Sequence, residues 1–407
     1  MKRKHFYSIF FAALIMSNTA FADITFSGMA GGTIGVAGQT GQDAGFNIPF
    51  AAFAAIQLNF DSWGIFRSNL GLITKSLANG NIFTGQDATL KMNEISLVLT
   101  RINADVKHYF GFYLGTYEVV GRDEFLQRQF GIDPISSLLT KSVSTLSPGI
   151  PLYDNQGTGF SYTASFGKLP GVAGANIYLS FTSNNTPQLN IDLRTAWTSN
   201  FITADISFGV GAPLQNKYAN TDVILLIDTI YFHAGATILL GSRYTHGLLL
   251  QAGIQSVKLT PGSFDRNFST AEDITFLIEP RIYTKSVKSR VTLYNIPEKA
   301  LNETLYLRDP FGVAFTIYSD TIPVKNNSMT FGTHLIASFK ETNVLDFFQL
   351  NLLDLKAWPE LNIYATPYVI LPVGSGNLEI MGQIGVCNVI NNIYIKYQAK
   401  VGYKKNF

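Results

Sequence analysis

Charged side chains stand two residues apart within stretches that are otherwise apolar. Asp192 and Arg194, for example, alternate with Ile191 and Leu193. Residues two apart on a β-strand share one face, so charges of both signs would lie together. Charges on the wall of a water-filled pore set its preference among ions. This pattern gives ten candidate pore-lining residues: Asp105, Lys107, Asp192, Arg194, Arg243, Glu279, Arg281, Arg290, Lys396 and Lys400. For each of them the alternative is a solvated side chain in the lumen without a selective role.

The sequence contains no pattern that indicates catalysis. Neither a Gly-x-Ser-x-Gly motif nor a His-Glu-x-x-His motif occurs. Beyond residue 22 the histidines are scattered singly, as His108, His233, His246 and His334. Cys387 is the one cysteine, which excludes an internal disulfide framework. We therefore predict that the protein is not an enzyme, and we assign no catalytic residue, metal site or cofactor.

The last fifteen residues show most clearly what kind of element would position such charges. One set of alternate residues is mostly apolar: Ile393, Ile395, Tyr397, Ala399, Val401, Tyr403 and Lys405. The other set is polar and basic: Tyr394, Lys396, Gln398, Lys400, Gly402, Lys404 and Asn406. A period of two indicates a strand, and its two unlike faces must divide two environments. Lipid outside a barrel and water inside it would supply them, as would a soluble sandwich.

The amino terminus has the three parts of a secretory signal peptide. Lys2, Arg3 and Lys4 are followed by the apolar run Phe6 to Met16 and by small residues around Ala22. The run is shorter than the ~20 residues that span a bilayer as a helix. We predict cleavage after residue 22, leaving a single domain over residues 23–407. This removes three basic residues, so the mature chain is nearly neutral and no nucleic-acid partner is expected.

Composition favours a membrane protein built from strands. Charged residues are 14% of the chain, against about 25% in ordinary soluble proteins, and the mean hydropathy is +0.16. Beyond the leader, no uncharged apolar run reaches the length of a membrane-spanning helix. Because a bilayer accepts only helices or closed barrels, an apolar chain without such helices predicts an all-β, antiparallel transmembrane barrel.

Alternating segments recur along the mature chain and predict sixteen to twenty strands, with eighteen as the best estimate. An even number would place both termini on the periplasmic side. Tight turns are expected at Asp61-Ser62, at Arg101 and at Gly374-Ser375-Gly376, with longer external loops between them. Pro280 and Pro367 each remove a backbone donor from a predicted strand. The predicted strands include Ile24 onward, Phe50–Phe60, Trp63–Thr74, Leu90–Thr100, Ile102–Leu114, Phe160–Phe166, Leu189–Trp197, Val223–Leu240 (as one strand or two), Phe347–Leu355, Leu361–Val373 and Leu378–Val386.

The carboxy-terminal segment resembles the signal strand of bacterial outer-membrane β-barrels, which ends in Phe and has apolar or aromatic residues at alternate positions. Ala399, Val401, Tyr403 and Phe407 match that pattern, whereas Lys405 departs from it. The resemblance implies a porin-like barrel in the cell outer membrane, in contact with its lipid. It also implies recognition of this strand by the barrel-assembly machinery.

Residues 121–157 lack the period of two and form a long predicted loop. It contains Arg122, Asp123, Glu124 and Arg128, and it follows five predicted strands as the third long loop. In position, in length and in its Asp-Glu-Phe run it is similar to the constriction loop of the general porins. That similarity implies a loop that folds into the barrel and narrows it with acidic residues. Acids facing basic wall residues would create a transverse field, and a surface loop is the alternative.

These features together predict the function. Barrels of sixteen or more strands enclose an aqueous lumen unless something plugs it. We therefore expect a porin-like channel for passive or weakly selective diffusion of small polar solutes. A transporter of hydrophobic solutes is one alternative, although the Asn-Pro-Ala hatch motif of the fatty-acid transporters is absent. A surface-exposed adhesin or structural barrel is the other. Many barrels of this class are trimers, and the sequence leaves a homo-oligomer open.

Overall fold

The computed structural model describes residues 24–40, 45–61, 63–74, 76–77, 88–167, 169–181, 187–214, 230–259, 274–324, 327–340, 358–390 and 392–407. The predicted signal peptide and the predicted strand Phe347–Leu355 lie outside these residues. Of the ambiguous segment Val223–Leu240, residues 230–240 are described and belong to a single strand.

Strands dominate the described chain. In its first half they are β1 (Ile24–Gln39), β2 (Gly45–Asn47), β3 (Phe50–Phe60), β4 (Gly64–Thr74), β5 (Ala88–Asn103), β6 (Val106–Thr116), β7 (Gln156–Phe166), β8 (Gly171–Phe181), β9 (Pro187–Thr198) and β10 (Ile202–Pro213). In its second half they are β11 (Ile230–Gly241), β12 (His246–Leu259), β13 (Ile274–Tyr283), β14 (Lys288–Asn295), β15 (Phe311–Val324), β16 (Asn327–Phe339), β17 (Leu361–Val373), β18 (Gly376–Cys387) and β19 (Tyr394–Asn406). The helices are short: α2 (Glu124–Phe130), the 3-10 helix η1 (Leu138–Thr140) and α3 (Glu298–Leu301). Among these described helices, none is long and apolar enough to cross a membrane.

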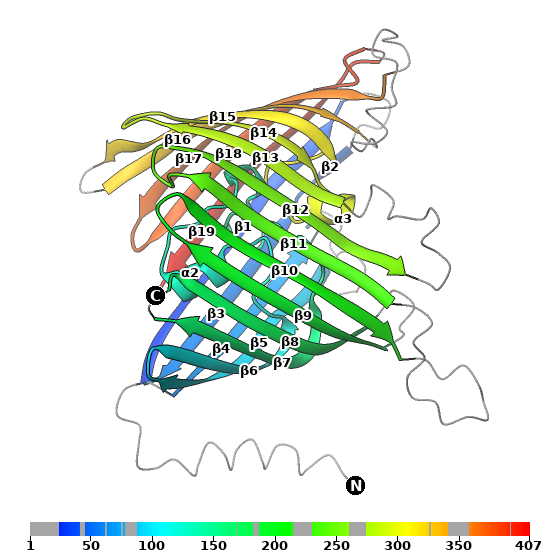
Figure 1. The fold of residues 1–407 in the computed structure, drawn as a ribbon. Helices are drawn as coiled ribbons and strands as arrows, with labels where there is room; N and C mark the ends of the chain where they lie inside the picture. The colour runs from blue at the N-terminus through cyan, green and yellow to red at the C-terminus, as the bar shows by residue number, and fades with distance from the viewer. Residues whose placement is uncertain are drawn as a thin grey trace, which may run out of the picture.

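The strands form one closed antiparallel barrel, in which each strand pairs with its neighbours in sequence (Figure 1). Closure comes from β1 and β19, which pair over eleven residues from Met29↔Asn406 to Gln39↔Lys396. β2 and β3 both pair with β1 and together occupy one position in the ring, so the barrel has eighteen strands. This confirms the predicted fold class and the predicted strand number.

The last residue completes the closure at the end of the barrel that carries the short connections. The backbone of Phe407 exchanges two hydrogen bonds with that of Gly28, at 2.8 and 3.0 Å. Its ring stacks on Phe26, with centroids 5.3 Å apart. A Cβ on Gly28 would lie 2.6 Å from the Phe407 ring, so glycine is required for this approach. The terminal aromatic therefore joins the last strand to the first described strand.

Exposure alternates along the strands as the sequence predicts. In β9 Ile191 and Leu193 are 48% and 46% exposed, whereas Asp192 and Arg194 are 0% and 6% exposed. In β19 the side chains of Tyr397 and Val401 face outward, and those of Gln398 and Lys400 are buried within the barrel. An apolar outer surface with a polar interior is the arrangement that a barrel needs in lipid.

The turn expected at Arg101 is wrong by three residues. β5 continues to Asn103, and the hairpin turns at Ala104 and Asp105, where Ala104 has φ +50°. The pairs Arg101↔His108 and Asn103↔Val106 define a two-residue connection. Arg101 is exposed near the rim of the barrel, where a long charged side chain can reach water without ending the strand.

Both prolines that weakened the strand predictions lie inside strands. Pro280 pairs with Leu248 on one side of β13, and Pro367 pairs with Thr333 on one side of β17. On the other side the ladder skips the proline and then resumes in the same register. Each proline therefore removes hydrogen bonds locally but leaves the strand order unchanged.

Among the connections that the structure describes, two fold inward rather than away from the barrel. We call residues 117–155, between β6 and β7, the first inward loop; it carries α2 and η1. We call residues 296–310, between β14 and β15, the second inward loop; it carries α3. Leucines of both loops share a buried apolar cluster with tyrosines of the wall, including Leu139, Leu152, Leu305, Tyr294 and Tyr364. The molecule therefore has an apolar core inside its lumen.

A glycine on the inner wall lets the first inward loop approach closely. A Cβ on Gly253 of β12 would lie 2.5 Å from the carbonyl oxygen of Leu152 and 2.7 Å from its Cβ. The absence of a side chain at this position makes room for the loop. Gly253 thus marks the place where the first inward loop passes the wall. A glycine in the sequence does not by itself predict such a contact.

Candidate functional site in the barrel lumen

The candidate pore-lining residues fall into three groups. Asp192, Arg194, Glu279, Arg281 and Arg290 are buried on the inner face of strands, and Lys400 and the less buried Lys396 lie on the inner face of β19. Lys107 has an inward position in β6 but is exposed near the short connections. Asp105 and Arg243 lie in short connections instead of strands, and Arg243 donates to Thr198 Oγ1 at 2.6 Å. Period-two patterning does not show where a strand stops, which explains these two positions.

Arg194 attaches the first inward loop to the wall. Its guanidinium makes a bidentate pair with Asp205 of β10, at 2.8 and 2.6 Å, and donates to the backbone carbonyl of Glu118. The guanidinium carbon also lies 4.0 Å from the centre of the Phe125 ring in α2. All of these groups are buried. Arg194 therefore holds a loop in place and does not face open water.

Glu279 plays a similar part on β13. Its carboxylate accepts from Arg281 at 2.8 Å and from Thr292 at 2.7 Å, and it lies 3.4 Å from Arg290. It also accepts a hydrogen bond from the Ser137 hydroxyl of the first inward loop. Two arginines thus balance one buried carboxylate that anchors the start of η1.

Asp192 gathers three partners that sequence reasoning did not connect. Its carboxylate is 2.7 Å from His233 Nε2 and accepts from the hydroxyl of Tyr153 at 3.0 Å and of Tyr178 at 3.4 Å. Tyr153 belongs to the end of the first inward loop and also contacts Ser207 at 2.6 Å. His233 faces inward from β11, a strand whose first residues the sequence left ambiguous. This network again fastens a loop to the wall.

The four constriction-loop residues lie in the first inward loop but differ in direction. Arg122 pairs with Glu303 of the second inward loop at 3.1 Å, and Arg128 reaches Glu94 and Glu118 at 3.5 and 3.4 Å. Asp123 is 3% exposed and accepts from the Ser136 amide and hydroxyl. Glu124 at the start of α2 is partly exposed. Glu124 is therefore the more accessible of the two acids.

Burial raises the pKa of Asp123 to about 6, because the loop around it removes water from the carboxyl. The two hydrogen bonds from Ser136 and the more distant Arg281 act in the opposite direction but are outweighed. The group is thus held by local hydrogen bonds and lacks a direct cationic partner among the described residues.

The sequence reasoning missed the second inward loop. Its Glu303 pairs with Lys91 as well as Arg122, and its Tyr306 donates to Glu379 of β18. Glu379 also pairs with Lys141 of the first inward loop at 2.8 Å, so one wall carboxylate joins both loops. A signal was present, because residues 297–310 begin and end with proline and lack the period of two.

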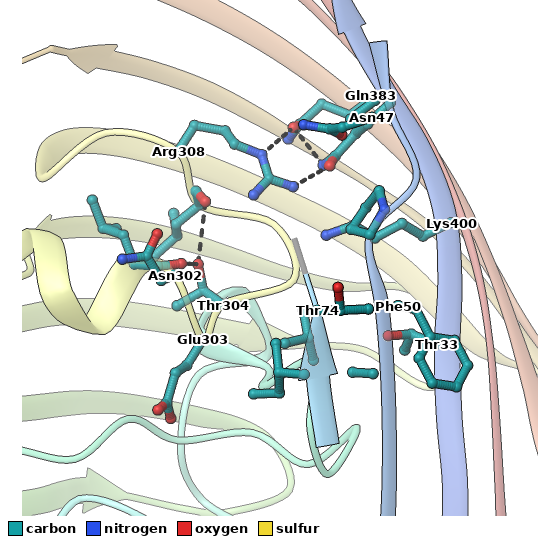
Figure 2. Close-up of a pocket in the computed structure, with 18 of the residues that line it drawn as sticks. Thr33, Asn47, Phe50, Thr74, Asn302, Glu303, Thr304, Arg308, Gln383 and Lys400 are labelled. Atoms are coloured by element: carbon teal, nitrogen blue, oxygen red, sulfur yellow. Dashed lines mark hydrogen bonds between the residues drawn. The ribbon is translucent and has the colours of Figure 1, made fainter. Parts of the chain in front are cut away.

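A cavity of about 890 Å³ opens between the second inward loop and the wall formed by β1, β3, β18 and β19. Its lining contains four cationic side chains, Lys91, Arg308, Lys396 and Lys400, and one acid, Glu303. Figure 2 shows Arg308 and Lys400 entering the cavity from opposite sides. Because Glu303 is paired with Lys91 and Arg122, the cavity retains a net positive charge.

Arg308 and Lys400 have no acidic hydrogen-bond partner among the described residues. The Arg308 guanidinium donates to Gln383 at 3.1 Å, to the Leu305 carbonyl at 3.1 Å and to Gln398. Burial lowers the pKa of Arg308 to about 10, so it stays charged at neutral pH. Lys400 is 8% exposed and forms neither an ion pair nor a hydrogen bond within the described residues. A buried cation without a counter-charge, as Arg308 is, favours a mobile anion, and an anion beside Lys400 would stabilise the charged form of that amine.

The described side chains offer nothing that would hold a metal. No group of three or more His, Cys, Asp or Glu side chains comes together with metal-binding geometry in the described ranges. The arrangement can instead attract charged solutes, orient them against amide groups and restrict their passage.

A closed eighteen-stranded barrel with an apolar exterior, a polar inner wall and inward loops has the architecture of an outer-membrane porin. The chain is similar in fold to a BenF-like porin from Pseudomonas fluorescens, with 9% identity over 96% of this chain and 100% of that one, at a TM-score of 0.53. It is also similar to Pseudomonas aeruginosa OpdQ, with 9% identity, coverage of 95% and 99%, and a TM-score of 0.51. The chain is similar as well to P. aeruginosa OpdL, with 9% identity over 95% of this chain and 99% of that one, at a TM-score of 0.50. No protein-family model and no curated protein matches the sequence.

Proposed function

We propose that the protein is an outer-membrane channel for small polar solutes and that it prefers anions. The observation that carries this proposal is the cavity at the mouth of the lumen, in which Arg308, Lys396 and Lys400 have no carboxylate partner among the described residues. A positive potential in a narrow, partly desolvated passage raises the local concentration of anions and repels cations.

The cavity also suggests which anions would fit. Gln398 lies beside Arg308 and donates one amide hydrogen to Gln383, which leaves its second amide hydrogen for an oxyanion, while Phe50 and Ala51 line another part of the cavity. A small organic carboxylate or phosphate would place its charge near Arg308 and Lys400 and its carbon part against the apolar wall. The volume of about 890 Å³ is within the usual range for small-molecule sites.

Location and partners follow from the same proposal. The apolar outer surface supports contact with outer-membrane lipid, and the resemblance of the last strand to assembly signals supports recognition by the barrel-assembly machinery. The leader segment would direct export and be removed. The exposed apolar side chains on the outer face of the described strands would also suit contact with further copies of the chain, as in a homo-oligomer.

The test is a planar-bilayer experiment on the refolded mature protein. In symmetric salt we expect stepwise openings, and in a KCl gradient the reversal potential should show preference for chloride. Lys400→Gln and Arg308→Gln should each lower the ratio of anion to cation permeability several-fold. Lys299→Gln is the matched control, because Lys299 lies on the same loop as Arg308 but is exposed and does not line the cavity.

The other outcomes separate the alternatives. A folded and inserted barrel that stays electrically silent would favour a route for hydrophobic solutes or a surface-binding role. A conducting wild type without chloride preference, or with the same preference in all three variants, would retain the channel and reject the anion site.

A further inference from the structure

The two inward loops are joined to each other by a short antiparallel contact, which we call the seam. Ser142 of the first inward loop and Thr304 of the second form an isolated antiparallel bridge. The Val143 amide donates to the Glu303 carbonyl at 2.9 Å, and the Leu305 amide donates to the Lys141 carbonyl at 2.7 Å. The seam itself consists of two backbone hydrogen bonds between segments far apart in sequence, and beside it the two loops share the buried apolar cluster and the carboxylate of Glu379.

The seam borders the cavity. Val143, Glu303 and Thr304 all belong to the cavity lining. Side chains of β4, β5, β9, β12, β13, β18 and β19 each bond to the first inward loop, so this loop is fastened around much of the ring. A solute that leaves the cavity toward the short connections therefore meets the two loops where they join.

Glu303 acts on the seam from the cavity side. Its carboxylate pairs with Arg122 of the first inward loop at 3.1 Å and with Lys91 of β5. The side chains of Glu303 and Lys91 are 25% and 38% exposed, so water and ions can compete for this pair. The backbone of Glu303 therefore takes part in the seam, while its partly exposed ion pair with Lys91 attaches the second inward loop to the wall.

We propose that the seam is a gate: the second inward loop separates from the first to open the path from the cavity, and the Glu303 ion pairs favour the closed arrangement. The barrel ladder takes no part in this movement, because both ends of the second inward loop stay paired at β14 and β15. The proposal rests on the proposed channel function, and its test separates the two.

The direct test is a disulfide across the seam, made with the double variant Ser142→Cys and Thr304→Cys. The hydrogen bonds on both sides make this a non-hydrogen-bonded antiparallel pair, whose Cα atoms are typically ~4.5 Å apart, within the range of about 4.4–6.8 Å for disulfides. We expect oxidation to reduce the single-channel conductance or the open probability in a planar bilayer. A thiol reductant should restore both in the same membrane.

Each single-cysteine variant, treated with the same oxidant, is the control for side effects at the site and at the native Cys387, which is buried. Unchanged conductance after complete cross-linking, in a protein whose reduced form conducts, overturns the gate and leaves the channel intact. A wild-type barrel that never conducts overturns both proposals.

A second variant tests the ion pairs without a disulfide. Glu303→Gln should raise the ratio of open to closed time by about two- to five-fold, the effect of losing partly exposed ion pairs. An open probability equal to that of the wild type, or lower, contradicts the role given to Glu303. This readout needs only a folded barrel, so it holds even if the double cysteine variant fails to refold.

Discussion

The Arg194 guanidinium bonds both to the barrel wall and to a loop inside it, and this double contact gives the residue its importance. Asp205 is 1% exposed and takes two of its hydrogen bonds, while Glu118 of the first inward loop takes another. Removing one member of a buried ion pair leaves the other charged and without water. At the scale of the residue, the charge of Arg194 on the lumen face therefore stabilises the position of the first inward loop, whether or not it also affects ion selectivity.

Arg194→Ala should destabilise the protein by about 3–5 kcal/mol, because Asp205 would stay buried without its partner. The free energy of unfolding in urea, measured from detergent micelles, checks this. Lys107→Ala is the control, since Lys107 also points inward in β6 but is exposed. A loss below about 0.5 kcal/mol, the range of ordinary surface substitutions, would contradict the anchoring role.

Asp123 predicts a pH dependence of stability. Burial raises its pKa to about 6, above the value of about 3.9 expected in the unfolded chain. The folded protein then binds more protons between these values, so stability falls as pH rises from ~4 to ~7 and is level outside that window. Relative to Asp123→Asn, the wild type should lose about 2–3 kcal/mol over this range. Unfolding curves of both proteins at pH 4 and pH 7 measure the difference, and parallel behaviour would refute it.

At the scale of the element, the first inward loop is shaped by the wall that surrounds it. Several strands of the wall carry carboxylates or arginines that face the interior. At Gly253 the wall has no side chain, and this leaves room for Leu152 of the loop. Loops that fill a lumen must satisfy their backbone groups there, and the wall side chains such as Gln251, which donates to the Gly121 carbonyl at 3.2 Å, do this.

Gly253→Val should displace the first inward loop without opening the barrel. The new side chain would collide with the Leu152 backbone, and overpacking of this kind costs about 1–3 kcal/mol. We expect faster trypsin cleavage after Arg122, Arg128 or Lys141 in the folded protein. Gly382→Val is the matched control, because a Cβ there meets nothing within 4 Å. Equal cleavage of both variants would show that the glycine is not needed for loop placement.

At the scale of the whole molecule, the barrel and its contents are separate layers of one structure. The barrel is held by backbone ladders that run around the ring and close through β1 and β19. The two inward loops are held by polar side chains of the wall and by an apolar cluster that both loops share with wall residues. Because the ladders do not depend on the inward loops, the loops can be changed while the barrel stays closed.

Replacing residues 297–309 with a short Gly-Ser turn should leave the barrel intact and raise its conductance. The Ile296 amide already bonds to the Pro310 carbonyl at 2.8 Å, so the ends of the loop are close enough for a tight connection. Heat-modifiable migration on a gel would report folding, and single-channel recording would report the wider lumen. A folded variant with unchanged conductance would show that the second inward loop does not obstruct the path.

The sequence by itself determined the barrel. Alternation at a period of two depends only on which side of a strand meets lipid and which meets the interior, so it is written locally in residues such as Ile191 and Asp192. The same rule predicted eighteen strands and the faces of β19. It failed at Arg101 and could not place the ends of strands, because a side chain at the rim keeps its alternation while the chain turns.

Only the tertiary structure decided what the lumen contains. The hydrogen bond from Ser137 to Glu279, and the ion pairs of Glu379 with Lys141 and of Glu303 with Arg122, join residues whose separation in sequence carries no period. Each depends on where a loop of irregular backbone comes to rest against distant strands. The second inward loop had no strand pattern, and its partners become neighbours only when the ring is closed. A local pattern can therefore define a barrel wall, whereas the cavity, its unpaired cations and the seam require the folded molecule.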